Sequence, residues 1–217
     1  MNIVVLSGSP RKGANTDIMV EAFAQAAREQ GHAVEVVPVA RKRIAGCLGC
    51  KYCFSHEGVC AQKDEMGDVI ETLKSADMAV FASPIYWFDV TAQEKSAIDR
   101  LYAFGGIGFP FHKTALLLDS HSDGVYDAAI AQYKATCAYC EWEDQGIVTI
   151  SGMTERDSMA TSPKLDEVRA LARRLAQGRV RAERANGTEH PARPGARGRC
   201  RSAHERGDIG LSPACRA

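Results

Sequence analysis

Short apolar runs alternate along the chain with longer segments whose apolar residues recur every three or four positions. The short runs predict β-strands, and the periodic segments predict α-helices. The predicted strands are residues 2–6, 34–39, 78–82, 113–119 and 146–151. The predicted helices are residues 15–30, 64–75, 91–104 and 125–139, followed by a last helix with the apolar stripe Leu165, Val168, Leu171, Ala172 and Leu175.

The predicted strands are continuous apolar runs, which is typical of a parallel sheet covered by helices on both faces. Because strands and helices alternate, we predict one doubly wound α/β domain over residues 1–177. The ligand of such a domain binds beyond the carboxyl ends of the strands, where the strand order reverses.

The composition is that of a soluble globular protein, since 45% of the 217 residues are apolar and 25% are charged. No apolar run approaches the roughly 18 residues that span a bilayer, and no basic segment precedes the first strand. We therefore expect a cytoplasmic protein with no membrane partner. Residues 1–177 carry 18 Lys and Arg against 23 Asp and Glu, and this net charge of −5 argues against a nucleic-acid partner.

The C-terminal segment differs in character from the rest of the chain. Residues 178–217 contain nine Arg, no Lys, no aromatic residue and only one each of Val, Ile and Leu. So few apolar side chains cannot offset the entropy of ordering, and we predict a disordered tail. A functional basic arm and an extension translated out of frame are the alternatives.

The first predicted strand runs through a polar loop directly into the first predicted helix. The start of a helix presents unpaired N–H groups and the positive end of the helix dipole, which favour an anion. The loop lacks the lysine of nucleoside-triphosphate loops and the G-x-G-x-x-G of dinucleotide sites, so one terminal phosphate of a mononucleotide fits best. An ordinary hydroxyl-capped turn is the alternative. The side chains expected to hold the phosphate are Ser7, Ser9, Arg11, Asn15 and Thr16.

The sequence Gly8-Ser9-Pro10-Arg11, with Asn15-Thr16, resembles the phosphate loop of the NADPH-dependent FMN reductase and iron–sulfur flavoprotein families. The resemblance extends to residues 83–87, to residues 95–100 and to a cysteine-bearing loop, and so covers residues 1–177. It implies bound FMN on a flavodoxin-like, five-stranded parallel sheet in the order 2-1-3-4-5.

The resemblance also implies which loops contact the flavin ring. One follows the third strand, where we expect one or two aromatic side chains at the flavin and the others in packing or a subunit interface. The other follows the fourth strand, where His121 is either a proton donor near the flavin or an exposed loop residue. The residues implied are Pro84, Ile85, Tyr86 and Trp87 in the first loop, and Asp119, Ser120 and His121 in the second.

Four cysteines lie between the second predicted strand and the second predicted helix, with the spacing C-x₂-C-x₂-C-x₆-C. Disulfides are not expected in a reducing compartment, and four thiolates suit a [4Fe–4S] cluster or zinc. The iron–sulfur flavoproteins carry a compact motif of this kind in the same place, whereas other relatives bind only FMN. Free or redox-active thiols therefore stay an alternative for Cys47, Cys50, Cys53 and Cys60.

The leading interpretation is an FMN-dependent oxidoreductase that passes electrons from NAD(P)H through FMN to a quinone, a nitro or azo compound, free flavin or oxygen. The flavin would carry this chemistry, and we expect no catalytic side chain. The first alternative is an iron–sulfur flavoprotein that accepts electrons from ferredoxin through a [4Fe–4S] cluster. The second is a non-catalytic mononucleotide-binding sensor. The resemblance also implies a homodimer or higher homo-oligomer.

Overall fold

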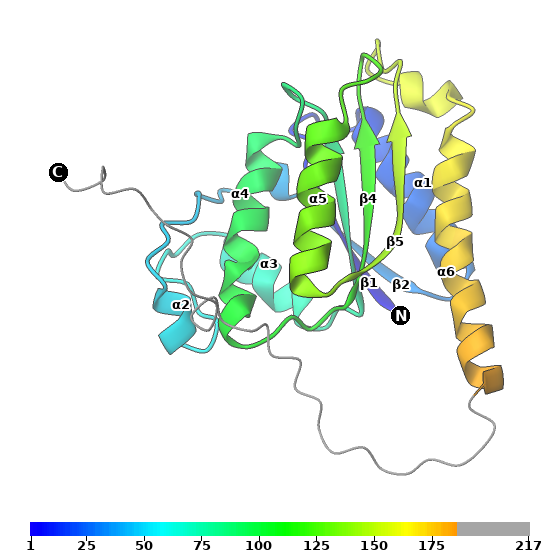
Figure 1. Ribbon diagram of the computed structural model, residues 1–217. Helices are drawn as coiled ribbons and strands as arrows, with labels where there is room; N and C mark the ends of the chain where they lie inside the picture. The colour runs from blue at the N-terminus through cyan, green and yellow to red at the C-terminus, as the bar shows by residue number, and fades with distance from the viewer. Residues whose placement is uncertain (186–217) are drawn as a thin grey trace.

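A parallel sheet forms the centre of the molecule (Figure 1). The computed structural model describes residues 1–185, in which five strands pair in the order β2-β1-β3-β4-β5, every pair parallel. The strands are β1 (Asn2–Ser7), β2 (Ala33–Val37), β3 (Met78–Pro84), β4 (Lys113–Asp119) and β5 (Glu143–Ile150). The predicted flavodoxin-like architecture and strand order are therefore confirmed.

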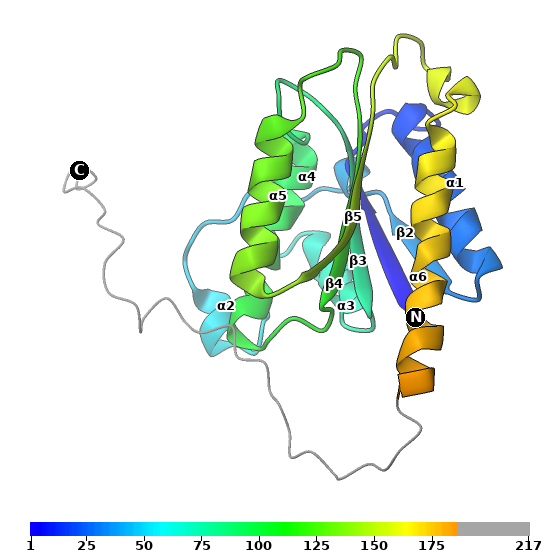
Figure 2. The same cartoon turned by 45° about the vertical axis from the view of Figure 1, so that its right-hand side comes forward.

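Helices cover both faces of this sheet. The α-helices are α1 (Asn15–Glu29), α2 (Tyr52–Ser55), α3 (Met66–Leu73), α4 (Ala92–Arg100), α5 (Asp127–Cys140) and α6 (Leu165–Ala185). Shorter 3₁₀ turns occupy Val39–Arg41, Leu101–Gly106 and Ser158–Thr161. Figure 2 shows α1 and α6 on one face of the sheet and α3, α4 and α5 on the other, so the sheet is doubly wound as predicted.

Successive side chains of the central strands enter two separate cores. Ile3 and Val5 of β1 are buried in the core beneath α1 and α6, whereas Val4 and Leu6 are buried in the core on the opposite face. Since neighbouring residues of a strand face opposite sides, a strand covered on both faces must be apolar throughout. The continuous apolar runs of β1, β3 and β4 have this cause.

The two edge strands depart from the prediction of continuous apolar runs. β2 exposes Ala33 and Glu35, and β5 exposes Glu143 and Asp144. At the periphery of the sheet the helices cover the strands less completely, so polar residues are tolerated there. For the same reason β5 begins at Glu143 and not at the predicted residue 146, because an apolar pattern does not reveal an exposed strand start.

Several other element boundaries differ from the prediction. The predicted helix over 91–104 begins at Ala92, because Thr91 is its N-cap and accepts the N–H of Glu94 on its hydroxyl at 3.2 Å. Regular α-helix then ends at Arg100, where a 3₁₀ turn takes over. The short helix α2 lies within a segment predicted to be a loop.

The C-terminal helix is longer than predicted. Helix α6 continues to Ala185, beyond the predicted domain boundary at residue 177. The rest of the predicted disordered tail, residues 186–217, lies outside the described residues. Within residues 1–185 no helix is long and apolar enough to cross a membrane.

Packing of α6 against the sheet predicts a large effect of shortening Leu171. Its side chain is fully buried, and its Cδ1 would lie 2.9 Å from a Cβ placed on Gly146 of β5. We expect Leu171→Ala to lower the free energy of unfolding by about 2–4 kcal/mol in urea denaturation, because it leaves a cavity. Arg173→Ala, on the exposed side of α6, is the control and should change it by less than about 0.5 kcal/mol. Equal effects of the two substitutions would contradict this packing.

Candidate functional site

Three loops begin side by side at the carboxyl edge of the sheet. Ser7 at the end of β1 pairs with Ala82 of β3, and Pro84 at the end of β3 pairs with Asp119 at the end of β4. The N–H of Ile85 donates to the carbonyl of Asp119 at 2.8 Å, which ties the second loop to the third. The structure therefore brings together the three segments from which the predicted FMN residues come.

The loop after β1 leads into the open N-terminus of α1. No side chain caps this helix at Ala14, so N–H groups of its first turn stay available to an anion. Arg11 is exposed on the same loop. The hydroxyl of Ser9 accepts a hydrogen bond from the backbone N–H of Arg11 at 3.3 Å. The hydroxyl of Ser7 is buried without a partner among the described residues. This loop has the charge and the donors for a phosphate.

Asn15 and Thr16 are buried and hold neighbouring loops in place. The amide of Asn15 donates to the carbonyl of Glu155 at 2.7 Å and accepts the N–H of Met159 at 2.9 Å. The hydroxyl of Thr16 donates to the carboxylate of Asp119 at 2.6 Å. A direct contact of either side chain with phosphate stays a prediction. Their structural role was missed because the partners are more than a hundred residues away in sequence.

The loop after β4 places its predicted residues in different environments. Burial raises the pKa of Asp119 to about 6, against the opposing effects of the Thr16 hydroxyl and the Arg11 charge. Ser120 is buried, and its hydroxyl is 2.6 Å from that of Tyr126. His121 is exposed. Asp119 thus lies next to the phosphate loop, whereas His121 lies on the surface.

The loop after β3 ends in an aromatic turn. Pro84 is buried and Ile85 half-buried, but Tyr86, Trp87 and Phe88 are exposed by 41%, 93% and 55%. None of these three rings packs in the core of the described chain, whereas contact with the flavin or with a second subunit stays a prediction. Two backbone hydrogen bonds between Tyr86 and Asp89 close the turn, which leaves its two central residues at φ of +50° and +70°. Such angles are strained for bulky side chains, and strain of this kind is usually retained for function.

A buried ion pair holds together the two ends of the cysteine-bearing loop at its base. Arg100, whose side chain is 2% exposed, contacts both carboxylate oxygens of Asp64 at 2.8 and 2.9 Å. Asp64 also accepts the N–H groups of Ala45 and Met66, and Arg100 donates to the carbonyl of Ala45. Although burial opposes it, these hydrogen bonds hold the pKa of Asp64 below its ordinary value. Residues on either side of the loop are therefore held together at its base.

The four cysteines of this loop differ in exposure and do not form a closed site. Cys53 is buried, Cys60 is half-buried, and Cys47 and Cys50 are exposed. Burial raises the pKa of the Cys53 thiol against the lowering effect of a backbone hydrogen bond, and the charges of the other three cysteines raise it further. Within residues 1–185 no three metal-binding side chains are arranged to hold a metal ion.

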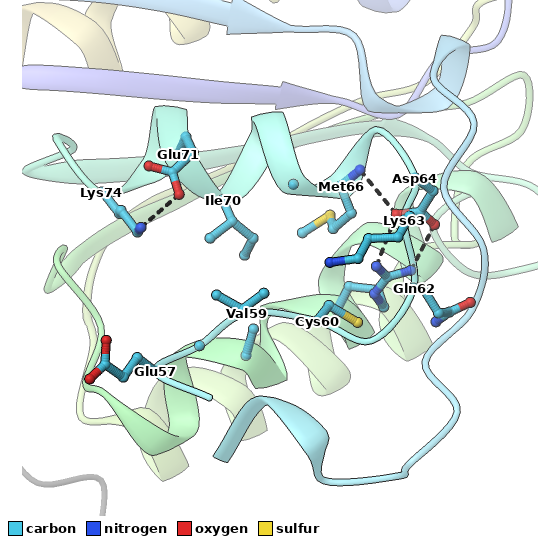
Figure 3. A pocket seen from close by; sticks show the side chains of 14 residues that line it. Glu57, Val59, Cys60, Gln62, Lys63, Asp64, Met66, Ile70, Glu71 and Lys74 are labelled. Carbon is cyan, nitrogen blue, oxygen red and sulfur yellow. Dashed lines mark hydrogen bonds and ion pairs between the residues drawn. The ribbon is translucent and has the colours of Figure 1, made fainter. Parts of the chain in front are cut away.

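A cavity of about 160 Å³ lies between α3 and the segment that carries Cys60 (Figure 3). Figure 3 shows Cys60 and Asp64 toward one end of the cavity and the Lys74–Glu71 ion pair at the other. Three cations and three anions line it, so the cavity has no net charge to attract an anion. The charged lining residues are Lys63, Lys74, Arg100, Glu57, Asp64 and Glu71.

Residues 1–155 match the sequence model of the family described as NADPH-dependent FMN reductase. The chain belongs to the NADPH-dependent FMN reductase family. This is a family that binds FMN, and the three loops at the carboxyl edge of the sheet lie within the matched residues.

Three relatives illustrate the range of this similarity. An iron–sulfur flavoprotein of Archaeoglobus fulgidus is 37% identical over 105 residues, or 48% of this chain and 47% of that protein. An NAD(P)H:quinone oxidoreductase from Methanothermobacter marburgensis superposes with a TM-score of 0.62 at 21% identity, covering 81% of this chain and 96% of that one. An FMN-dependent NADH-azoreductase from Bacillus anthracis, solved in complex with FMN, gives 0.59 at 15% identity, covering 81% and 100%.

These similarities carry different weight. At 21% and 15% identity, the two solved structures are evidence for the fold alone. The chain spans about half the length of the curated relatives it matches. The activity, substrates and partners of the whole protein are therefore treated as proposals below.

The donor set of the cysteine loop fits an iron–sulfur cluster in its chemistry. Four thiolates at short spacing suit such a cluster, and the N–H of Gly49 already donates to the sulfur of Cys47 at 3.4 Å. The left-handed backbone at Gly49 and Lys51, with φ of +64° and +57°, turns the chain between successive cysteines. The four thiols would have to come together around a cluster, because no three metal-binding side chains of residues 1–185 are arranged to hold an ion.

The sequence analysis missed two buried charged residues of this family member, Glu94 and Arg100, both on α4. Glu94 lies in a Thr-x-x-Glu pattern that is usually a helix cap, and Arg100 lies in a stretch noted only for its resemblance. Neither pattern indicates burial. Only the packing of α4 between the phosphate loop and the cysteine loop reveals it.

The ion pair at the base of the cysteine loop predicts that neutralising Asp64 destabilises the protein and loosens the loop. We expect Asp64→Asn to lower the free energy of unfolding by about 1–3 kcal/mol, because it leaves the buried guanidinium of Arg100 without its counter-charge. Trypsin should also cut faster at the exposed Lys51 within the loop. Asp68→Asn, on the exposed side of α3, is the matched control. Equal cleavage rates in the two variants would show that this ion pair does not restrain the loop.

Proposed function

We propose that this chain binds FMN across the carboxyl ends of β1, β3 and β4 and acts as an FMN-dependent oxidoreductase with NAD(P)H as electron donor. The observation that carries the proposal is the meeting of three loops at this edge in a member of the NADPH-dependent FMN reductase family. The open N-terminus of α1 supports the phosphate end of the site.

The residues around the edge have separate tasks in this proposal. Arg11 and the N–H groups at the start of α1 bind the phosphate, which they neutralise in part. Thr16 and Asp119, joined by their hydrogen bond, keep the first and third loops in register. The buried Pro84 and the half-buried Ile85 present backbone and apolar surface to the polar and flat parts of the ring. Bound FMN would supply the redox chemistry.

The aromatic turn is the entrance of the proposed site. Trp87 and Phe88 are exposed, so an aromatic electron donor or electron acceptor can stack on these rings without moving a core residue. The acceptor is a small molecule of the class of quinones, nitro or azo compounds, free flavin or oxygen. In a homodimer, a second copy of the chain would cover part of this exposed apolar surface.

A second function is favoured by the cysteine loop. Curated relatives with 33–37% identity are named iron–sulfur flavoproteins, and the loop offers four free thiols as ligands. In this proposal Cys47, Cys50, Cys53 and Cys60 hold a [4Fe–4S] cluster, and the protein takes electrons from ferredoxin. Arg100 and Asp64 hold the base of the loop that carries these ligands.

The phosphate loop predicts different effects of two substitutions. Arg11→Ala should weaken FMN binding by roughly 1–3 kcal/mol in a fluorescence titration, since it removes a charged partner of the phosphate. It should leave the melting temperature without FMN unchanged, because Arg11 is exposed. Asn15→Ala should lower that melting temperature, because it releases Glu155 and Met159.

Lys12→Ala, a change of the exposed neighbouring charge, is the control for general electrostatic attraction. It should weaken FMN binding by less than about 0.5 kcal/mol. If the Arg11 and Lys12 variants weaken FMN binding by the same amount, the hypothesis of a specific contact between Arg11 and the phosphate is wrong.

The cysteine loop predicts a metal content that analysis can measure. Protein purified without oxygen should contain about four iron and four sulfide per chain if the loop holds a [4Fe–4S] cluster. Cys53→Ser should lose both while FMN stays bound, because the phosphate loop is a separate site. Cys140→Ser in α5 is the control and should keep both. Zinc without visible colour, or iron-free protein with only flavin bands, would contradict the cluster.

A further inference from the structure

A buried carboxyl group lies directly behind the phosphate loop. Glu94, in the first turn of α4, is fully buried. A Cβ placed on Gly8 would lie 2.7 Å from the Cβ of Glu94 and 2.8 Å from its carboxyl carbon. Glycine at position 8 is therefore required to leave room for this side chain. The acid packs against the backbone of the loop that we propose for the FMN phosphate.

Helix capping does not account for this acid. In a Thr-x-x-Glu capping box, the glutamate side chain accepts the N–H of the threonine. Here the N–H of Thr91 is donated to the hydroxyl of Ser83 at 3.0 Å, and the hydroxyl of Thr91 donates to the carbonyl of Gly8 at 2.7 Å. Neither carboxyl oxygen of Glu94 has a hydrogen-bond partner among the described residues. A buried polar group in this state costs stability.

The surroundings of Glu94 oppose its ionisation. Burial raises its pKa to about 8, against a smaller lowering by the Ser83 side chain and the Ala82 backbone, which lie close to the carboxyl group but do not form a hydrogen bond of good geometry with it. These two residues of β3, together with Gly8 of the phosphate loop and Thr91 before α4, lie against the side chain, and none of them is titratable. No charged group of the described residues contributes to the pKa of Glu94, so none of them stabilises its ionised form.

Charged residues of the neighbouring segments interact elsewhere. Lys95 pairs with Asp99 on the surface of α4 at 2.5 Å, and the carboxylate of Asp89 accepts the N–H of the next residue at 2.7 Å. The charge of Arg11 acts on Asp119, the other buried acid at this edge. The pKa of Asp119 is about 6, so that residue has largely ionised before Glu94 begins to titrate.

We propose that Glu94 is a positioning residue that couples FMN binding to a proton: the phosphate loop binds FMN tightly when the Glu94 carboxyl group is neutral and more weakly when it is ionised. This inference rests on the proposed FMN site. A phosphate monoester carries close to two negative charges above pH 7, and a carboxylate buried behind the same loop repels it. When FMN binds to the ionised form, the carboxylate takes a proton from water or buffer acid, which forms its O–H bond and breaks the bond of the proton to that donor, and no bond of FMN changes.

The direction of the pH dependence follows from linkage. FMN binding raises the pKa of Glu94 further above its value of about 8 in the free protein. Affinity is then constant well below that pH and falls as the pH rises through it. For one ionising group, FMN binding should weaken about tenfold between pH 7 and pH 9.

The test compares three proteins in FMN fluorescence titrations at pH 7, 8 and 9. Wild type and Asp99→Asn, a change of an exposed carboxylate on the same helix, should both lose about tenfold in affinity. Glu94→Gln, which keeps the shape but does not titrate, should lose less than about twofold. Calorimetry at pH 9 in two buffers of different protonation enthalpy should show proton uptake by wild type and none by Glu94→Gln. A tenfold loss or a proton uptake that persists in Glu94→Gln overturns the proposal.

Stability without FMN provides a second readout. Because the folded pKa of Glu94 is raised from 4.5 to about 8, the protonated acid stabilises wild type most at low pH, and this contribution is lost as the pH rises to about 8. The melting temperature of Glu94→Gln relative to wild type should therefore rise between pH 5 and pH 8. An unchanged difference overturns the proposal, and Glu94→Leu replaces the glutamine variant if that one does not fold. If wild type binds no FMN at any pH, the FMN site itself is wrong.

Discussion

The parallel pairing of β3 with β1 on one side and with β4 on the other is the constraint on which the rest of the structure depends. Parallel strands end at a common edge, so the loops that follow β1, β3 and β4 must begin beside one another. Two hydrogen bonds then join these loops directly: the N–H of Ile85 to the carbonyl of Asp119, and the hydroxyl of Thr16 to its carboxylate. The proposed FMN site is a consequence of strand direction together with these two bonds.

Helix α4 connects the two candidate sites. Glu94 in its first turn packs against the phosphate loop, and Arg100 at its end closes the base of the cysteine loop through Asp64. Arg100 lies six positions after Glu94, a rise of about 9 Å along a helix. The proposed phosphate loop and the cysteine loop therefore each contact one end of the same short helix.

Features that reduce stability gather at one edge of the molecule. The buried hydroxyl of Ser7 and the carboxyl group of Glu94 have no partners among the described residues, and the backbone at Trp87 and Phe88 is strained. The apolar residues of the three central strands, by contrast, are packed in two regular cores. Departures from those rules are expected where a ligand binds, because the requirements of binding then override those of folding. Their common position supports the assignment of this edge as the site.

The sequence by itself determined the order of strands and helices, the parallel sheet and the family, because continuous apolar runs and the Gly8-Ser9-Pro10-Arg11 loop are local signals. It did not predict the exposed edge strands or the turn that exposes Tyr86, Trp87 and Phe88, since burial depends on what covers a residue. Tertiary structure alone decided that Asn15 holds the loop after β5, that Asp64 and Arg100 close the cysteine loop, and that Glu94 is buried behind Gly8. Each of these depends on partners distant in sequence, and no local pattern records which distant residue will come to lie opposite.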